Sequence, residues 1–236
     1  HANGLLLAEG VVRPADARED RAVYAFPHLS FEEYLAALYL WELPDFDEAV
    51  KLAGNPAWRE VIRFLGESLC YGAKKKIRDA RALLAELCPE TAPVDDGDWR
   101  RVWLAGELLP ALRNEASEKQ RDAALDERIV GRLVELVENP RALGGAPLDR
   151  AAAGRTLGRL GDPRPGVGCY PEEHPAAGLP QMAWVAVPGG TFRMGQGWRE
   201  DPQAEDNEKW PRNAKSVSVG DFYLASFPGT GAQFAA

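Results

Sequence analysis

Cysteine is scarce in this sequence, and its spacing excludes two kinds of site. The chain of 236 residues contains three cysteines, which lie far apart and form no Cys-x-x-Cys pair: Cys70, Cys88 and Cys169. An odd, widely spaced set does not predict a disulfide framework, and it does not match the ligand spacing of a structural zinc site. We therefore expect a protein of the reducing cytoplasm.

Basic charge is also in deficit. The chain carries 28 lysine and arginine residues against 36 aspartate and glutamate residues, a net charge of -8. A general nucleic-acid binder normally has a basic excess, so nucleic acid is not an expected partner. No run approaches the roughly 20 apolar residues of a membrane span, so no membrane association is predicted.

Glycine-rich nucleotide-binding loops are missing as well. The glycines at 189–190 and 195–197 match neither Gly-x-x-x-x-Gly-Lys-Ser/Thr nor Gly-x-Gly-x-x-Gly between a strand and a helix. The first residue is His1 rather than methionine, and a strand-like run follows almost at once. We therefore expect a piece of a larger protein, without a signal peptide.

What the sequence does contain is centred on residues 23–41. Alternation over 22–28 predicts a strand, which forms a hairpin with the apolar run between two glycines at 4–10. A helix is predicted to begin at Ser30, three residues before Glu33, in the Ser-x-x-Glu pattern of a capped N-terminus. An apolar stripe at helical spacing is expected to be buried: Phe31, Tyr34, Leu35, Leu38 and Trp41.

The twelve residues from Phe26 resemble the F-x-H-x-S-F-x-E-Y-x-A-A signature of NACHT-type signal-transducing NTPases. The matching positions are Phe26, His28, Ser30, Phe31, Glu33 and Tyr34. In that family the signature ends a winged-helix domain, so the resemblance implies that residues 1–28 are its hairpin wing. It also implies that ATP and magnesium bind only in an ATPase module upstream. An ordinary capped amphipathic helix is the alternative interpretation.

Residues 29–160 are predicted to be helix after helix. Apolar periodicity and cap signals indicate helices at 46–52, 58–72, 74–87, from Asp98 past Pro110, from Ser117 to 138, and at 147–160. The lengths and short connections match stacked antiparallel helix pairs, so we expect a mainly α fold with an irregular HEAT-like stack. In the last helix, small residues are expected to let a neighbour approach closely: Ala151, Ala152, Gly154 and Gly158.

The composition changes after this helical region. Residues 161–181 hold five prolines and four glycines without periodicity, and they are expected to be a linker with little structure. Strands are predicted over 182–194, around a Pro-Gly-Gly turn, and over 215–224, with a Gly-Asp turn signal inside.

Residues 182–236 carry a second resemblance, to the formylglycine-generating-enzyme (sulfatase-modifying-factor) family, a variant of the C-type lectin fold. The opening W-V-x-I-P-x-G-x-F-x-M-G is matched by Trp184, Pro188, Gly190, Phe192, Met194 and Gly195. The resemblance implies the N-terminal portion of such a domain, with short β-strands. Asn213 replaces an expected histidine, and Gly229 and Gly231 replace a valine and an asparagine, which puts the family's substrate chemistry in doubt.

None of the reactive groups forms a convincing catalytic set in the sequence. His28 is expected to fix the corner between strand and helix, and the adjacent Glu32 and Glu33 do not face each other on a helix. The basic run 74–76 is expected to be a solvated face with intramolecular salt bridges, or to meet an acidic partner surface. Cys70 and Cys88 are expected to be buried at helix ends. We predict no catalytic, cofactor or metal site in this chain.

Together these observations predict a non-catalytic sensor or regulatory segment of a modular NACHT-type ATPase in bacterial signalling or antiviral conflict response. Its partners would be a protein or trigger ligand, and oligomerisation would occur through the parent ATPase. One alternative is a positioning region for a formylglycine-generating-enzyme-like oxidase. Another is a helical adaptor without nucleotide control.

Overall fold

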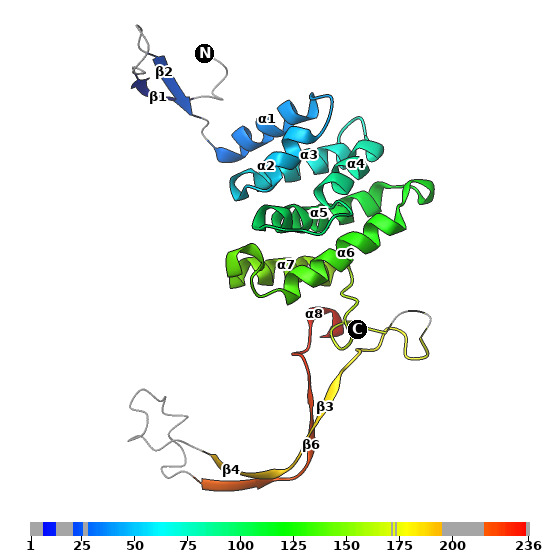
Figure 1. Ribbon diagram of the computed structural model, residues 1–236. Helices are drawn as coiled ribbons and strands as arrows, with labels where there is room; N and C mark the ends of the chain where they lie inside the picture. Colours follow the sequence, from blue (N-terminus) through cyan, green and yellow to red (C-terminus); the bar gives the residue numbers. More distant parts are fainter. Residues whose placement is uncertain are drawn as a thin grey trace. The chain divides into compact units, whose positions relative to one another are not determined.

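The computed structural model describes residues 7–12, 21–25, 28–170, 172, 174–194 and 215–234. The chain divides into two compact units, His1–Asp162 and Pro163–Ala236. It is mainly helical, with a few short antiparallel strands, as the sequence predicts (Figure 1). Phe26 and Gly195, which belong to the two predicted signatures, lie outside the described residues.

The first unit opens with the predicted hairpin. Strand β1 (Leu7–Val12) pairs antiparallel with β2 (Arg21–Ala25), and the register shifts once, between Ala8 and Gly10. Such a shift marks a bulge, which bends one strand and increases the local twist.

The rest of the first unit is helical, and the helices follow one another through short connections. They are α1 (Leu29–Trp41), α2 (Asp47–Ala53), η1 (Pro56–Trp58), α3 (Arg59–Tyr71), α4 (Ile77–Leu87), α5 (Asp96–Glu115), η2 (Glu118–Gln120), α6 (Ala123–Glu138), η3 (Ala142–Gly145) and α7 (Pro147–Leu160).

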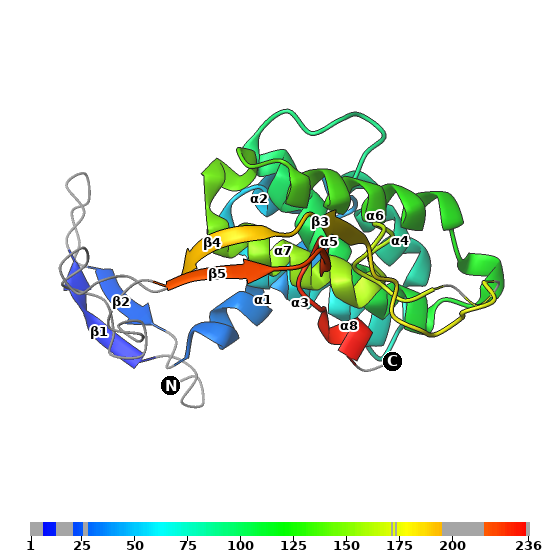
Figure 2. The same ribbon diagram turned by 90° about the horizontal axis from the view of Figure 1, so that it is seen from below.

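Helix α5 lies in the middle of this helical stack (Figures 1 and 2). It contacts α2, α3 and α4 as well as α6 and α7, and α1 packs against α3. Its buried residues point in nearly every direction around the helix axis, which a helix permits only where neighbours cover it on several sides. The fully buried leucines Leu104 and Leu109 lie on α5, and Leu133 and Leu136 meet it from α6.

The predicted inward faces of α3, α4 and α6 are confirmed. Apolar residues at helical spacing are buried on each of them, for example Ile62 and Leu65 on α3, Leu83 and Leu84 on α4, and Ile129 on α6. The end of α7 at Gly161 also agrees, since that residue has φ +92°. A positive φ of this size favours glycine and stops an α-helix.

Three predicted helix starts are wrong by a few residues. Helix α5 is capped by Asp95, not by Asp98, because the Asp95 carboxylate accepts from the Asp98 amide, 2.8 Å away. Ser117 starts the short turn η2, while Asp122 caps α6. Helix α4 begins at Ile77 rather than at Lys74. The segments before α5 and α6 each offer more than one residue able to cap, and the sequence does not show which one the backbone uses. At α4 the N-cap is Lys76, which makes no side-chain cap hydrogen bond.

The prediction of close approach at Gly154 and Gly158 is also wrong. A Cβ on Gly158 would meet nothing within 4 Å, and one on Gly154 would meet Val137 only at 3.9 Å. The close contacts lie elsewhere in the stack. A Cβ on Gly66 would lie 2.6 Å from Leu108, and one on Gly106 would lie 2.6 Å from Leu133. These two glycines therefore let α3 and α6 approach α5 closely.

The second unit contains a two-stranded antiparallel ribbon. Strand β3 (Trp184–Val187) pairs with β6 (Phe222–Ala225), and β4 (Gly190–Met194) pairs with β5 (Lys215–Val219). The two pairs follow each other along the same ribbon (Figure 1). A short helix, α8 (Gly231–Phe234), follows β6. The strands are those that the sequence predicts.

Candidate functional site

The corner before α1 is built from the histidine of the first signature. His28 is the N-cap of α1, and its Nδ1 accepts a hydrogen bond from the Ser30 amide at 3.3 Å. The Ser30 hydroxyl lies 2.7 Å from the same nitrogen. A capping role for Ser30 is therefore wrong, because His28 already fills that position. The structural role predicted for His28 agrees with this geometry.

Four of the five residues in the predicted stripe on α1 are exposed, which contradicts the sequence prediction. The fifth, Trp41, is partly buried against the core. Phe31 is 49% exposed, and Tyr34, Leu35 and Leu38 are exposed too. The side of α1 that packs into the helical stack is formed by Ala37 and Leu40, with partly buried residues beside them. We call the outward set the α1 face: Phe31, Tyr34, Leu35 and Leu38.

The reason for this difference lies in the residues that α1 presents to α3. Alanine at 36 and 37 allows α1 to approach α3 closely on that side, and Leu40 fills the space beside them. Tyr34 reaches α3 only at its edge, where its ring meets Phe64 with centroids 6.1 Å apart and planes nearly perpendicular. Spacing identifies an apolar stripe, but it does not tell which of two apolar sides meets the neighbour.

The ribbon carries the second signature and exposes apolar side chains in a similar way. Trp184 is 59% exposed on β3, and Phe192 and Met194 are exposed on β4. On the partner strands Phe222 and Leu224 are exposed as well. A two-stranded ribbon is marginally stable alone, because it has no third strand or helix to cover an apolar face.

The ribbon bends where the signature places Pro188 and Gly190. Between them, a Cβ on Gly189 would lie 2.7 Å from the Val219 carbonyl oxygen and 2.8 Å from the Asp221 nitrogen. The Gly189 amide donates to the Asp221 carboxylate at 2.6 Å. Glycine is needed at 189 because the two backbones touch there.

Gln233, near the end of the second unit, forms hydrogen bonds to residues 161–181, the segment predicted to be a linker. No role for Gln233 was predicted from the sequence. The side chain is 6% exposed, and its Nε2 lies within hydrogen-bond distance of three backbone carbonyl oxygens. These belong to Gln181 (2.7 Å), Gly166 (3.1 Å) and Gly168 (3.2 Å). The Thr230 hydroxyl donates to the Val167 carbonyl at 2.8 Å. Two glycines precede Gln233 and Phe234 follows it, and these neighbours in the sequence do not predict such long-range contacts.

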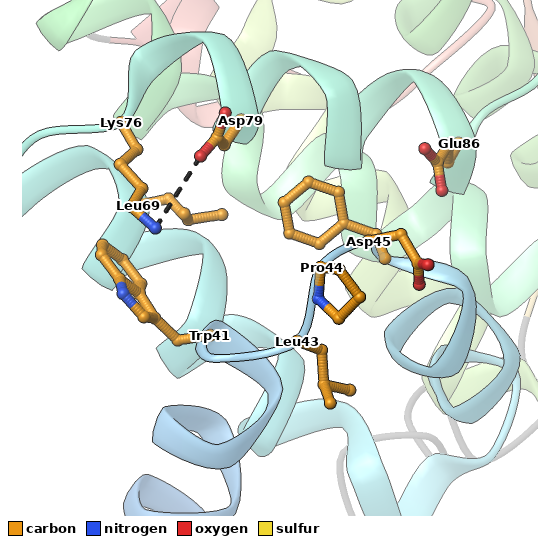
Figure 3. A pocket seen from close by; sticks show the side chains of 9 residues that line it. Trp41, Leu43, Pro44, Asp45, Leu69, Lys76, Asp79 and Glu86 are labelled. Carbon is orange, nitrogen blue, oxygen red and sulfur yellow. Dashed lines mark ion pairs between the residues drawn. The ribbon is translucent and has the colours of Figure 1, made fainter.

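A pocket of about 280 Å³ lies where α1, α3 and α4 meet the connection between α1 and α2 (Figure 3). The Lys76 ammonium lies on one side, 4.3 Å from the centre of the Trp41 ring and 3.9 Å from the Asp79 carboxylate. Asp45 and Glu86 lie on the other side (Figure 3). The apolar part of its wall is formed by Leu43, Pro44, Phe46 and Leu69.

A second charged site lies inside the helical stack. Arg59 forms an ion pair with Glu107 and stacks on Trp103, with its guanidinium carbon 4.4 Å from the ring centre. The Trp103 indole donates to the Thr156 hydroxyl at 3.2 Å. Burial raises the pKa of Glu107, and it outweighs the opposite effect of Arg59 and Arg63. These contacts link α3, α5 and α7, which indicates a structural role.

Cys70 and Cys88, the two cysteines of the helical stack, are buried. Burial raises the pKa of the Cys70 thiol to about 11, and burial also raises the pKa of Cys88, against the effect of Arg128. Both thiols are therefore poor nucleophiles near neutral pH. Among the described residues there is no group of three or more histidine, cysteine or acidic side chains able to hold a metal. In the same residues no helix has the length and apolarity to cross a bilayer.

The basic run 74–76 pairs within the chain, as predicted. Lys75 forms an ion pair with Glu115, and Lys76 pairs with Asp79. Of the two arginines that follow, Arg81 donates to the Gln120 carbonyl at 3.3 Å. Charges of this kind hold neighbouring helices together rather than forming a free basic patch.

Comparison with known proteins adds no name to this description. No family model matches the chain, and neither a curated protein nor a solved structure matches it.

Proposed function

We propose that this chain is a non-catalytic coupling segment of a larger NACHT-type ATPase, which serves bacterial signalling or antiviral conflict response. The observation that carries this proposal is the distribution of exposed apolar surface. The well-packed helical region, 29–160, exposes apolar side chains on its first helix, at the α1 face, and the ribbon that follows the region in the sequence exposes them as well. A segment that docks to polypeptide on both sides would have this distribution.

The α1 face supports docking on the N-terminal side. Contiguous exposed apolar patches are uncommon on proteins that have no partner there, and they mark interaction sites. Four large side chains of this face follow one another within eight residues, directly after the hairpin β1–β2. We propose that the face packs against the winged-helix domain to which residues 1–28 would belong.

The ribbon supports docking on the C-terminal side. Its exposed aromatic side chains include Trp184 and Phe192, which belong to the second signature. We propose that residues 182–236 are the first part of such a domain and that polypeptide encoded downstream covers them. Burying a large aromatic or aliphatic side chain contributes about 1.5–3 kcal/mol, so several of them would stabilise this union.

The helical stack suits transmission between two such modules. Helix α3 contacts α4 and α5, and α5 contacts α6 and α7, so each of them contacts the next helix and the one after it. In stacks of helix pairs with such contacts, a displacement at one end passes through successive packed helices. We propose that the stack is HEAT-like and that ligand recognition in the C-terminal module changes the nucleotide state of the ATPase through it.

The decisive experiment uses the full reading frame from which this chain derives. It is expected to encode a Gly-x-x-x-x-Gly-Lys-Ser/Thr loop upstream of residue 1. In the full-length protein, Leu35→Glu with Leu38→Glu is expected to change the steady-state ATP hydrolysis rate several-fold, because both charges would be forced into the proposed docking surface. Hydrolysis is measured by phosphate release, and assembly by analytical ultracentrifugation.

The control is Val94→Glu, which places one negative charge, against two in the α1 double variant, on an exposed apolar residue of the loop between α4 and α5. It is expected to leave hydrolysis and assembly unchanged. Equal effects of Val94→Glu and the α1 variants would contradict docking at the α1 face. A reading frame without the phosphate-binding loop would overturn the ATPase proposal and leave a helical adaptor.

A further inference from the structure

The pocket between Trp41 and Glu86 has an unbalanced charge that its own residues do not neutralise. Four charged side chains line it: Lys76, Asp79, Asp45 and Glu86. Lys76 pairs with Asp79, and neither Asp45 nor Glu86 forms an ion pair with a described residue. Two negative charges therefore remain on the side opposite Lys76 (Figure 3).

Asp45 and Glu86 are both exposed to solvent, and repulsion acts between their carboxylates. The pKa of Glu86 is raised, first by burial and then by repulsion from Asp47 and Asp45. The Asp45 carboxylate is held in place by the Asp47 amide, which donates to it at 3.2 Å. Asp45 and Glu86 come from different elements, the connection before α2 and the helix α4, and they meet only at this pocket.

The walls indicate what kind of cation fits. A metal ion would need six or more oxygen ligands if it were calcium, whereas the walls beside the carboxylates are apolar. An organic cation needs both features at once, carboxylates for its head and apolar surface for its stem. The pocket already holds one such group, because the Lys76 ammonium lies over the face of Trp41.

We propose that this pocket binds an organic cation, with an ammonium or guanidinium head beside Asp45 and Glu86 and an aliphatic stem along Leu43, Phe46 and Leu69. Its volume of about 280 Å³ lies just under the range of roughly 300–1,000 Å³ typical of drug-sized ligands. That size suits a small amine or one basic side chain of a partner. This inference does not rest on the proposed function, because every lining residue belongs to the helical stack.

The test is a titration of the intact chain followed by ¹H–¹⁵N NMR at the Trp41 indole and at the amides of 45 and 46. The probes are butylguanidinium and acetyl-arginine amide, with the neutral acetyl-citrulline amide as a ligand control. We expect saturable shifts with the two cations in the millimolar range and none with the citrulline compound. If the arginine compound binds at least as tightly as butylguanidinium, the source is a polypeptide side chain; if only butylguanidinium binds, the source is a free small molecule.

Variants separate the pocket from the general acidity of the chain. Asp45→Asn with Glu86→Gln is expected to weaken binding at least five-fold. The control, Glu118→Gln with Glu127→Gln, makes the same change of net charge at exposed positions outside the pocket and is expected to change nothing. Lys76→Met is expected to tighten binding about two- to five-fold, because it removes a like charge from the pocket.

Circular dichroism of each variant verifies that the helices are intact. If Asp45→Asn with Glu86→Gln and the control Glu118→Gln with Glu127→Gln weakened cation binding equally, the proposal would be overturned, since binding would then follow net charge alone. Binding of the citrulline compound with the same affinity would overturn it too. So would the lack of any saturable shift with either cation in both the original chain and Lys76→Met.

Discussion

The helical region and the ribbon of this chain use similar residues in opposite ways. Leucine and tryptophan on α5 are covered by neighbours on several sides, so that Leu109 is fully buried and Trp103 nearly so. Tryptophan and phenylalanine on β3 and β4 are covered by one partner strand and remain about half exposed. Apolar content therefore does not distinguish the two regions. The two regions differ in the number of helices and strands that surround each apolar residue, and the ribbon has too few strands to bury its apolar side chains.

The α1 face belongs with the ribbon in this comparison, although it lies on the helical region. Its residues are as apolar as those of α3, yet α3 has neighbours on more than one side and α1 packs chiefly against α3. We infer from this difference in packing that the interior helices contribute most of the stability of the helical region. The two regions with exposed apolar residues are those where another polypeptide would contribute most.

The largest effect is expected from a core truncation compared with the same change on the ribbon. Leu133→Ala removes a fully buried side chain between α5 and α6, and it is expected to destabilise the helical region by about 2–5 kcal/mol. Phe192→Ala is expected to change the same transition by less than about 0.5 kcal/mol, because its ring packs against little. Urea unfolding followed by far-UV circular dichroism measures both, and similar losses would break the comparison.

A smaller effect distinguishes two helical glycines. Gly106→Ala is expected to destabilise by about 1–3 kcal/mol, because the new Cβ would lie 2.6 Å from buried Leu133. Gly158→Ala is expected to stabilise by about 0.4–1 kcal/mol, since it restricts the unfolded chain and meets nothing within 4 Å. Thermal unfolding of the two variants shows directly whether each substitution raises or lowers the stability. A stabilising Gly106→Ala would refute the close approach of α5 and α6.

The smallest effect concerns pH. Burial raises the pKa of Cys70 to about 11 from an ordinary value of 9.0. The folded state therefore keeps a proton that the unfolded state has lost, so stability falls as pH rises from about 9 to about 11. Cys70→Ala is expected to reduce that fall, and Cys169→Ala is the control that should not. Urea unfolding midpoints at several pH values in this interval test the prediction. If the midpoint of Cys70→Ala fell with pH as steeply as that of the original chain, the burial effect would be contradicted.

Local rules predicted much of the fold, and the failures have a common cause. Periodicity located the helices and strands, and the inward faces of α3, α4 and α6 follow from it because each has a single apolar side. Helix α1 has two such sides, Ala37 with Leu40 and Phe31 with Leu35, so spacing alone did not decide which would be buried. The predicted caps failed where two polar residues compete within a turn.

The candidate sites depend on contacts that no short pattern contains. Asp45 and Glu86 lie forty-one positions apart in the sequence and meet only because α2 packs on α4. Gln233 reaches backbone carbonyls more than fifty residues away. Only the packed structure brings such groups together, so the sequence analysis identified neither the pocket nor the role of Gln233.

The central claim is that the ribbon is completed by polypeptide outside this chain. Hydrogen exchange followed by mass spectrometry, on this chain alone and on the longer protein that we propose contains it, tests that claim. We expect the amides of β3 to β6 to exchange rapidly in the chain alone and to become at least a hundred-fold slower in the full-length protein, while those of α5 change little. Ribbon amides that exchange at the same rate in both proteins would contradict the account.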